Sequence, residues 1–112
     1  MLIYHICRRE EWDGAVRAGR YDGSAQDRAD GFIHFSTAAS VVESAAKHRA
    51  GQPDLVLVAV EATRLGPDLK WEKSRGGIPF PHLYGALPID RVKWVRELPL
   101  GEAGRHVFPT LE

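Results

Sequence analysis

The chain has 112 residues, which is enough for one folded domain and too few for two separate hydrophobic cores. Its 15 Lys and Arg residues balance its 15 Asp and Glu residues, so it lacks the cationic excess that a general nucleic-acid binder needs. The longest apolar run, residues 55–60, is far shorter than the roughly 20 residues of a membrane-spanning helix, so no membrane span is expected.

The first third of the chain predicts a strand, a helix and a loop. Residues 2–6 form an apolar run typical of a strand. Residues 9–18 place apolar side chains at the i, i+3, i+4 spacing of one helix face, and Gly19 then provides a left-handed stop. Residues 20–30 show no period and contain three aspartates, so they predict an exposed loop.

The middle of the chain predicts a strand, a second helix and the central strand. Residues 31–36 are expected to form the strand, after which Thr37 is expected to cap the helix and Gly51 to end it. Apolar residues between positions 38 and 46 form the buried stripe of this helix. Residues 54–61 carry apolar side chains without alternation, which is typical of a strand covered on both faces.

The last third of the chain predicts mainly strands. Glycines and prolines at residues 74–81 exclude regular structure there and predict a second loop. With helices early and strands late, residues 1–112 are expected to form a single α+β domain, in which two helices pack on one mixed or split β-sheet. Strands are expected at residues 69–73, 82–84 and 92–98, a turn at 88–91 and a hairpin near 106–108.

Three of the predicted strands each carry a histidine, at His5, His34 and His82. Because residues two apart in a strand share a face, His34 is expected beside Ser36, and His82 beside Tyr84. An imidazole can act as a general acid or base, as a metal ligand or as a hydrogen-bonded interior group. We expect the three histidines to meet at a cleft as candidate catalytic residues, with a hydrogen-bonded interior role as the alternative for each.

A second candidate patch lies at Trp71, Glu72 and Arg75, the last of which precedes two glycines. An arginine beside glycines can bind a phosphate or a carboxylate, because the guanidinium is bidentate and glycine lets backbone N–H groups approach. A flexible turn with a solvated arginine is the alternative. Glu72 is a candidate acid or base, or else a solvent-facing carboxylate. No Cys-x-x-Cys or His-x-x-x-His spacing supports a metal site, so none is predicted.

The sequence holds one cysteine, Cys7, which cannot form an internal disulfide. Disulfides persist mainly in oxidising compartments. The N-terminal residues show neither the basic region nor the small-residue cleavage site of a secretory signal. A cytoplasmic location is therefore expected, with Cys7 as an ordinary buried thiol.

Three blocks of the sequence resemble a known family. They are Ile-Tyr-His-Ile at residues 3–6, Asp-Gly-Phe-Ile-His-Phe-Ser-Thr at residues 30–37 and the segment from Trp-Glu to Pro-His-Leu-Tyr-Gly at residues 71–85. Over nearly its whole length the chain resembles the small bacterial and plant family catalogued as domain of unknown function 952. Members of that family are similar in fold to the ADP-ribosyltransferases, whose split sheet holds NAD in a cleft between its halves. The resemblance thus implies an ADP-ribosylation-like fold and, by resemblance only, NAD as a ligand.

The same resemblance implies roles for particular residues. His5 would take the first-strand position that faces the ribose, and Ser36 and Thr37 resemble the Ser-Thr pair of the second-strand motif. The Glu-x-Glu pair that such transferases carry on a late strand is not found in the sequence, which leaves Glu72 as the candidate acid. Fold analogy by itself does not establish an activity.

Together these observations predict a cleft that binds a small anionic or nucleotide-like ligand, with acid–base chemistry by histidine compatible with it. Its expected ligand-binding residues are Ser36, Thr37, Trp71, Glu72, Arg75 and Tyr84. The alternative is a non-catalytic interaction or structural domain, in which the histidines hydrogen-bond the sheet and the Arg-Gly-Gly loop contacts a partner protein. An open concave site favours the first reading, and a filled cleft with internally satisfied side chains favours the second.

Overall fold

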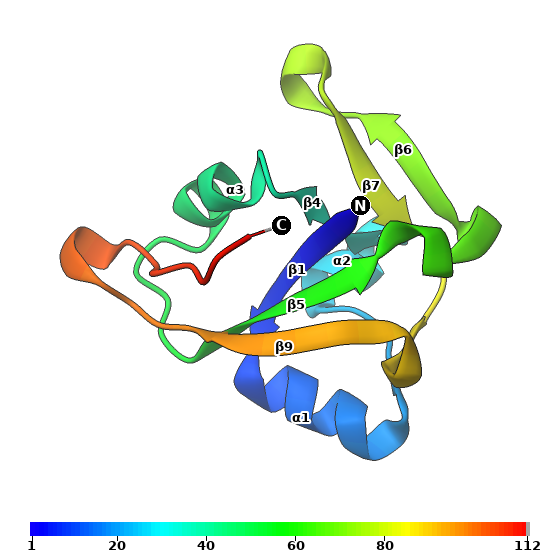
Figure 1. Ribbon diagram of the computed structural model, residues 1–112, viewed down its shortest axis with the longest axis horizontal. Coiled ribbons are helices and arrows are strands. Elements are labelled where there is room, and N and C mark those ends of the chain that lie inside the picture. The colour runs from blue at the N-terminus through cyan, green and yellow to red at the C-terminus, as the bar shows by residue number, and fades with distance from the viewer. Residues whose placement is uncertain (112) are drawn as a thin grey trace.

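The computed structural model describes residues 1–111, except for the side chain of Arg75. Four strands form its central sheet: β1 (Leu2–Arg8), β4 (Ser36–Thr37), β5 (Leu55–Glu61) and β9 (Val92–Leu98). They lie in the order β4-β1-β5-β9 and cross the middle of Figure 1. The predicted central strand is confirmed, because β5 pairs with β1 on one side and with β9 on the other.

The remaining strands form two smaller sheets. One contains β3 (Ile33–His34), β6 (Leu69–Lys73) and β7 (Pro79–Leu83), and the other contains β2 (Arg20–Tyr21) and β8 (Leu87–Pro88). The hairpin of β6 and β7 projects away from the central sheet in Figure 1. The strands are divided among three sheets, as the split alternative predicted. All pairings between described strands are antiparallel, so the mixed alternative is wrong.

The predicted second strand is interrupted, because β3 belongs to the three-stranded sheet and β4 to the central one. Phe35, between them, donates its N–H to the carbonyl oxygen of Pro81 at 3.0 Å. Proline has no N–H to return this hydrogen bond, so the ladder of β3 ends there. The predicted alternation of faces is confirmed, since Ile33 and Phe35 are buried while His34 and Ser36 are partly exposed.

Two helices form near their predicted positions. The first, α1 (Arg9–Ala18), ends at Gly19, whose φ of 83° is left-handed. The second, α3 (Val41–His48), begins later than predicted. Thr37 is extended because it pairs with β1, so its prediction as the helix cap is wrong, and Ser40 takes that position.

A third helix, α2 (Ala25–Asp30), lies where the sequence predicted an exposed loop, so that prediction is wrong. Ser24 caps this helix, because the N–H of Asp27 donates to Ser24 Oγ at 3.2 Å and the N–H of Ser24 donates to Asp27 Oδ2 at 2.8 Å. The helix is too short to show a hydrophobic period, so only its Ser-x-x-Asp capping box marked it in the sequence.

The predicted second loop is shorter than expected. It contains a single 3-10 turn at Arg75–Gly77, in which Gly76 has a left-handed φ of 81°, and β7 begins at Pro79. The predicted extended piece at 82–84 is the end of β7 and its continuation. At the C-terminus, the expected hairpin is a single bridge between Leu100 and His106.

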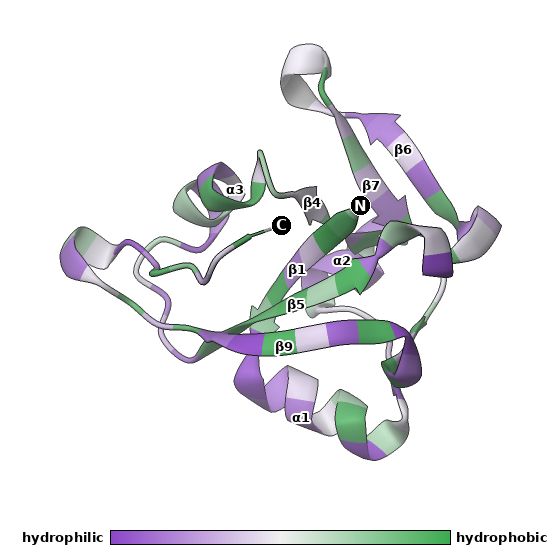
Figure 2. Cartoon of the chain, viewed as in Figure 1, coloured by the Kyte–Doolittle hydropathy of each residue, from purple (hydrophilic) through white to green (hydrophobic). Residues whose placement is uncertain are grey.

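The two middle strands of the central sheet, β1 and β5, are buried on both faces, and Figure 2 shows hydrophobic residues along them. In β1, Ile3 faces one core together with Trp12 of α1, and Tyr4 faces the other together with Val41 of α3. His5 shares the face of Ile3, as strand alternation predicted. In the part of the chain that the structure describes, no helix is long and apolar enough to cross a membrane.

Candidate functional site

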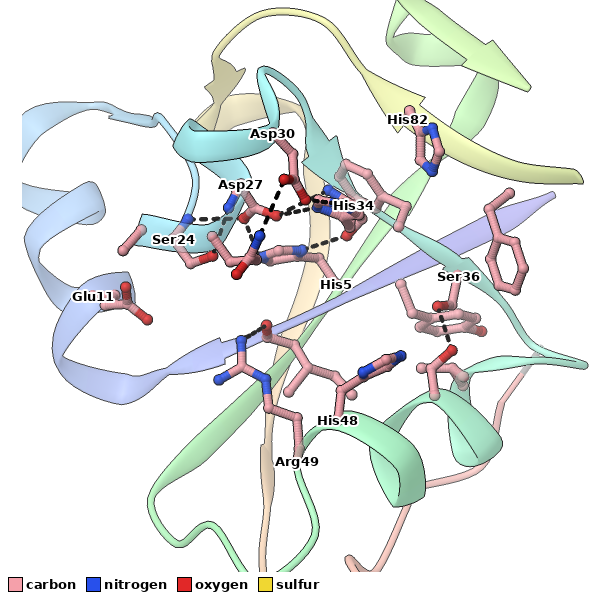
Figure 3. Close-up of a pocket in the computed structure, with 18 of the residues that line it drawn as sticks. His5, Glu11, Ser24, Asp27, Asp30, His34, Ser36, His48, Arg49 and His82 are labelled. Atoms are coloured by element: carbon pink, nitrogen blue, oxygen red, sulfur yellow. Dashed lines mark hydrogen bonds and ion pairs between the residues drawn. The ribbon is translucent and has the colours of Figure 1, made fainter. Parts of the chain in front are cut away.

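A cleft of about 710 Å³ lies where the central sheet meets the three-stranded sheet. It is open to solvent, and Figure 3 shows polar side chains around the hollow. Its wall combines residues of β1, α2, β3, α3 and β7, which are far apart in the sequence. The charged and imidazole groups that line it are His5, Arg8, Glu11, Asp27, Asp30, His34, His48, Arg49 and His82.

His5 is buried at the base of this cleft, with 4% of its surface exposed. Its Nδ1 donates to the carbonyl oxygen of His34 at 2.6 Å, which leaves Nε2 to accept a hydrogen bond from the Tyr21 hydroxyl at 2.8 Å. Burial lowers the pKa of His5 below its ordinary value, so the ring is neutral. These contacts match the interior role that the sequence left open as an alternative.

Asp27, a buried residue of α2, is the centre of the polar network. It accepts hydrogen bonds from the N–H groups of Ser24 and His34 at 2.8 and 3.2 Å, and from His34 Nδ1 at 2.6 Å. Burial alone would raise the pKa of this carboxyl group, but the hydrogen bonds from His34 and Ser24 outweigh it and hold the pKa well below its usual range. Asp27 is therefore ionised at neutral pH.

His34 lies between two carboxylates. Its Nδ1 is 2.6 Å from Asp27 Oδ1, and its Nε2 is 3.1 Å from Asp30 Oδ2. The hydrogen bond to Asp27 raises the pKa of His34, burial opposes it, and the charges of Asp27 and Asp30 raise it further. The raised pKa favours the imidazolium form, in which both ring nitrogens can donate to these carboxylates.

His82 enters the cleft from the hairpin of β6 and β7. Its Nδ1 is 2.8 Å from Glu72 Oε1, and the Tyr84 hydroxyl donates to the same oxygen at 2.6 Å. The hydrogen bonds from Tyr84 and His82 lower the pKa of Glu72, and the bond to Glu72 raises that of Tyr84. The ring centroids of His82 and His34 are 5.5 Å apart, so the hairpin and β3 bring the two imidazoles together.

Some of the predicted site residues meet at this cleft and others do not. His5, His34, His82 and Ser36 line it, and Ser36 Oγ donates to Ser44 Oγ on α3 at 3.3 Å. Glu72 and Tyr84 are not part of the described wall, but Glu72 bonds His82, and Tyr84 bonds Glu72. Thr37 also lies outside the described wall, with Oγ1 3.0 Å from Ser40 Oγ.

Trp71 does not line the described cleft, because strand alternation puts it on the opposite face of β6 from Glu72. It is 44% exposed, so it is not a core residue either. The predicted phosphate-binding side chain of Arg75 lies outside the described residues.

The sequence did not predict the acidic helix α2 or the basic side of the cleft. Asp27 and Asp30 were placed in a loop, although their spacing from Ser24 and His34 was visible. Figure 3 shows Arg49 and His48 on the other side of the hollow from these carboxylates. Arg49 donates to the carbonyl oxygen of Ile6 at 3.2 Å.

Within residues 1–111, no group of histidine, cysteine and carboxylate side chains is arranged to hold a metal ion. The two carboxylates of α2, Asp27 and Asp30, are both engaged by His34.

Three solved chains match this chain, and all three are structures of one protein. The crystal structure of protein CC0527 from Caulobacter crescentus is 52% identical with a TM-score of 0.93, and the match covers 96% of this chain and 94% of that one. The solution NMR structure of CC0527 is 54% identical with a TM-score of 0.84, covering 93% of this chain and 90% of that one. A comparison with curated proteins finds no match.

A family model described as "Protein of unknown function (DUF952)" matches residues 6–95. This span includes the Ile-His-Phe-Ser-Thr and Pro-His-Leu-Tyr-Gly blocks on which the resemblance was based. It therefore contains His34 and His82, which line the cleft. The resemblance to this family is thus confirmed, and the chain belongs to the DUF952 family.

Proposed function

We propose that the protein binds a small anionic, nucleotide-like ligand in the cleft between its sheets. The observation that carries this proposal is the cleft itself, an open cavity of about 710 Å³ lined by imidazole, carboxylate, guanidinium and aromatic groups. Small-molecule sites are concave and have volumes of roughly 300–1,000 Å³, with a few convergent polar groups. The cleft meets each of these criteria.

The distribution of charge in the cleft supports a ligand with two chemically different parts. Arg8, His48 and Arg49 line it as basic groups, and guanidinium groups bind phosphate in a bidentate geometry. Asp30 and Glu11 line it as carboxylates, which accept hydrogen bonds from ribose hydroxyls in nucleotide sites. A nucleotide carries both a phosphate and a ribose.

An ADP-ribosylation-like fold with an NAD-related ligand is the more specific form of this proposal. It draws on the resemblance to the ADP-ribosyltransferases and is supported by the position of the cleft, which takes its wall from two separate antiparallel sheets. His5 and Ser36, which the resemblance places at the ribose and in the second-strand motif, both line this cleft. NAD and ADP-ribose are therefore the first compounds to test.

The location we propose for the protein is the cytoplasm. The buried free thiol of Cys7 suits this reducing compartment.

A non-catalytic interaction domain is the second candidate. One observation favours it: no buried side-chain nitrogen or oxygen atom of the described residues lacks a hydrogen-bond partner, so the polar network of His5 and Asp27 is complete without a ligand. In addition, Trp71 and Ile78 of the hairpin region expose apolar side chains that a partner protein could cover.

A thermal-shift screen separates the two candidates. NAD, ADP-ribose, AMP, ADP and inorganic phosphate are each added to the full chain, and the melting temperature is measured. A ligand at 100 times its Kd stabilises the folded state by about 2.7 kcal/mol, which raises the melting temperature by several degrees. We expect such a rise with at least one nucleotide.

The variant Arg49→Gln tests whether the shift comes from this cleft, because it removes a cationic group from the wall. Arg105→Gln is the matched control, since Arg105 is exposed and lies outside the described wall. The shift should fall in Arg49→Gln and persist in Arg105→Gln. No shift with any of the five compounds would contradict ligand binding and favour the interaction domain.

A further inference from the structure

Two histidines at the cleft differ in how many of their ring nitrogens contact a carboxylate. His34 and His82 both line the cleft, and Figure 3 shows them beside the same hollow. Each ring is fixed by at least one carboxylate, but His34 uses both nitrogens for this and His82 uses one. The remaining nitrogen of His82 distinguishes the two rings chemically.

The ring of His82 keeps its Nε2 for the cleft. Because Glu72 accepts the hydrogen of Nδ1, the neutral ring carries its lone pair on Nε2. Among the described side chains and backbone groups, none forms a hydrogen bond with this nitrogen. Phe32 stacks on the ring with centroids 4.1 Å apart and fixes its plane. His82 is therefore a positioned proton acceptor.

The ring of His34 is a positioned proton donor. Asp27 holds Nδ1 from the buried side, and Asp30 accepts from Nε2 at 3.1 Å on the solvent side. The Asp30 side chain is 39% exposed, so an oxygen of a ligand can take its place as the acceptor. A proton on Nε2 is thus available to the cleft while the charge of the ring is held by Asp27.

We propose that His82 and His34 act as the general base and the general acid in the hydrolysis of a phosphate ester of the nucleotide-like ligand. This inference rests on the proposed function, because it requires the phosphate of the ligand in the cleft. A proton acceptor beside a proton donor is the arrangement that ester hydrolysis needs, and general acid–base catalysis contributes about 10²–10⁴-fold to rates. Arg8 and Arg49, on the same wall, can neutralise the phosphate.

The proposed step balances without a further reactant. Water attacks phosphorus and its proton passes to Nε2 of His82, so a new P–O bond forms. The ester P–O bond breaks, and the departing oxygen takes the Nε2 proton of His34. The products are an alcohol and a phosphate with one ester bond fewer. His82 then loses its proton to solvent and His34 regains one.

Glu72 and Tyr84 act in this proposal as positioning residues. Glu72 fixes the hydrogen of His82 on Nδ1, and Tyr84 fixes Glu72 by donating to the same oxygen. Replacing Glu72 by glutamine offers an amide that can also donate, so the preference of His82 for the Nδ1–H tautomer should be lost.

The first test reads these states directly. Histidine is labelled with ¹⁵N, and two- and three-bond ¹⁵N–¹H correlations of the full chain are recorded between pH 6 and 9. We expect His34 to be protonated on both nitrogens at pH 7 and the neutral form of His82 to carry hydrogen on Nδ1. A neutral His34 at pH 7, or a hydrogen on Nε2 in neutral His82, would overturn the proposal.

The second test measures hydrolysis of adenosine 2′,3′-cyclic phosphate, whose leaving alkoxide needs a proton, and of bis(p-nitrophenyl) phosphate, whose leaving phenolate does not. An asparagine amide takes the place of Nδ1 but offers nothing at Nε2. His82→Asn therefore keeps the contact with Glu72 and should slow both reactions by about 100-fold or more. His34→Asn keeps the contact with Asp27 and should slow the cyclic phosphate about 100-fold, but the nitrophenyl ester less than about 10-fold.

The control is His106→Asn, because His106 lies outside the described wall and its ring nitrogen Nε2 bonds the carbonyl oxygen of Gln52. Its rates should equal those of the unchanged chain. Equal rates in His82→Asn, or no hydrolysis of either probe, would refute the acid–base proposal. A nucleotide that raises the melting temperature without being hydrolysed leaves ligand binding in place, whereas the lack of any shift removes the proposed function itself.

Discussion

Two carboxylate–imidazole clusters of the molecule differ in burial and therefore in what they do. The α2–β3 cluster, Asp27 with Ser24, His34 and His5, is built on a carboxylate whose side chain is 4% exposed. The hairpin cluster, Glu72 with His82 and Tyr84, is built on one whose side chain is 40% exposed. Burial of Asp27 makes the α2–β3 cluster necessary for the fold, because a buried charge without hydrogen-bond partners is very costly. The second lies at the rim, where Glu72 can orient a ring without holding the fold together.

The largest expected effect comes from breaking the buried cluster. Asp27→Asn keeps the shape of the side chain but removes the charge that faces His34 and accepts from Ser24. The amide that replaces the carboxylate has a single acceptor oxygen, so donors from Ser24 or His34 lose their acceptor, which typically costs about 1–3 kcal/mol in a buried site. We expect the free energy of unfolding, measured with urea, to fall by about that amount. Asp30→Asn is the matched control and should change stability much less, and equal losses in both variants would contradict the contrast in burial.

The next effect concerns the capping box of α2, a helix where a loop was predicted. Ser24→Ala removes the hydroxyl that accepts from the N–H of Asp27, and loss of such a cap typically costs about 1 kcal/mol. Ser74→Ala is the control, because Ser74 precedes a 3-10 turn without a side-chain cap bond. Urea unfolding of both variants should show a loss only for Ser24→Ala. A loss of the same size in Ser74→Ala would count against the cap.

The third prediction concerns pH. The pKa of His34 is raised in the folded state, so its contribution to stability is fully present below the ordinary value of 6.5 and is lost as the pH rises through the folded pKa. His34→Asn should cost about 0.5–1 kcal/mol at pH 5.5, since His34 is partly exposed, and less at pH 9. Urea unfolding at both pH values checks this. A cost that grows with pH would reverse the sign and contradict the imidazolium.

At the acidic end, the same cluster predicts a loss of stability through Asp27. Its pKa is lowered in the folded state, so its contribution is present above the ordinary value of 3.8 and is lost as the pH falls below it. The difference in stability between the unchanged chain and Asp27→Asn should therefore shrink below about pH 4. A difference that stays constant down to pH 2 would contradict an ionised Asp27.

The smallest expected effect on stability lies in the hairpin cluster. Glu72→Gln should leave the unfolding midpoint in urea unchanged within error, because this carboxylate is at the surface. It should instead move the pKa of Tyr84 back down toward its ordinary value of 10, since the acceptor charge is gone. Ultraviolet absorbance of the phenolate, titrated against pH, measures this. A stability loss as large as that of Asp27→Asn would remove the distinction between the two clusters.

Strong local patterns in the sequence predicted much of the scaffold. The unbroken apolar run of β5, the helical spacing before Gly19 and the strand at β9 each formed where expected. In the site, strand alternation predicted that His34 and Ser36 share a face away from Ile33. These features depend on neighbours in the chain, so the sequence alone contains them.

Features that depend on contacts between distant segments were mispredicted. Thr37 has the residue type of a helix cap, but pairing with β1 keeps it extended. Residues 20–30 resemble a loop because α2 is too short for a period, and burial of Asp27 against His34 stabilises it. Prolines argued against a strand at Pro79 and Pro81, yet pairing with β6 places both in β7.

The sequence by itself determined the family, the α+β class, the central strand and which histidines share faces with which neighbours, because each follows from local residue patterns. Only the tertiary structure decided that Asp27 holds His34 and that Glu72 orients His82. The physical reason is that each contact joins side chains from two different elements, α2 and β3 in one case and β6 and β7 in the other. Whether an imidazole is neutral, charged or free to accept a proton depends on the carboxylates that the fold brings to it.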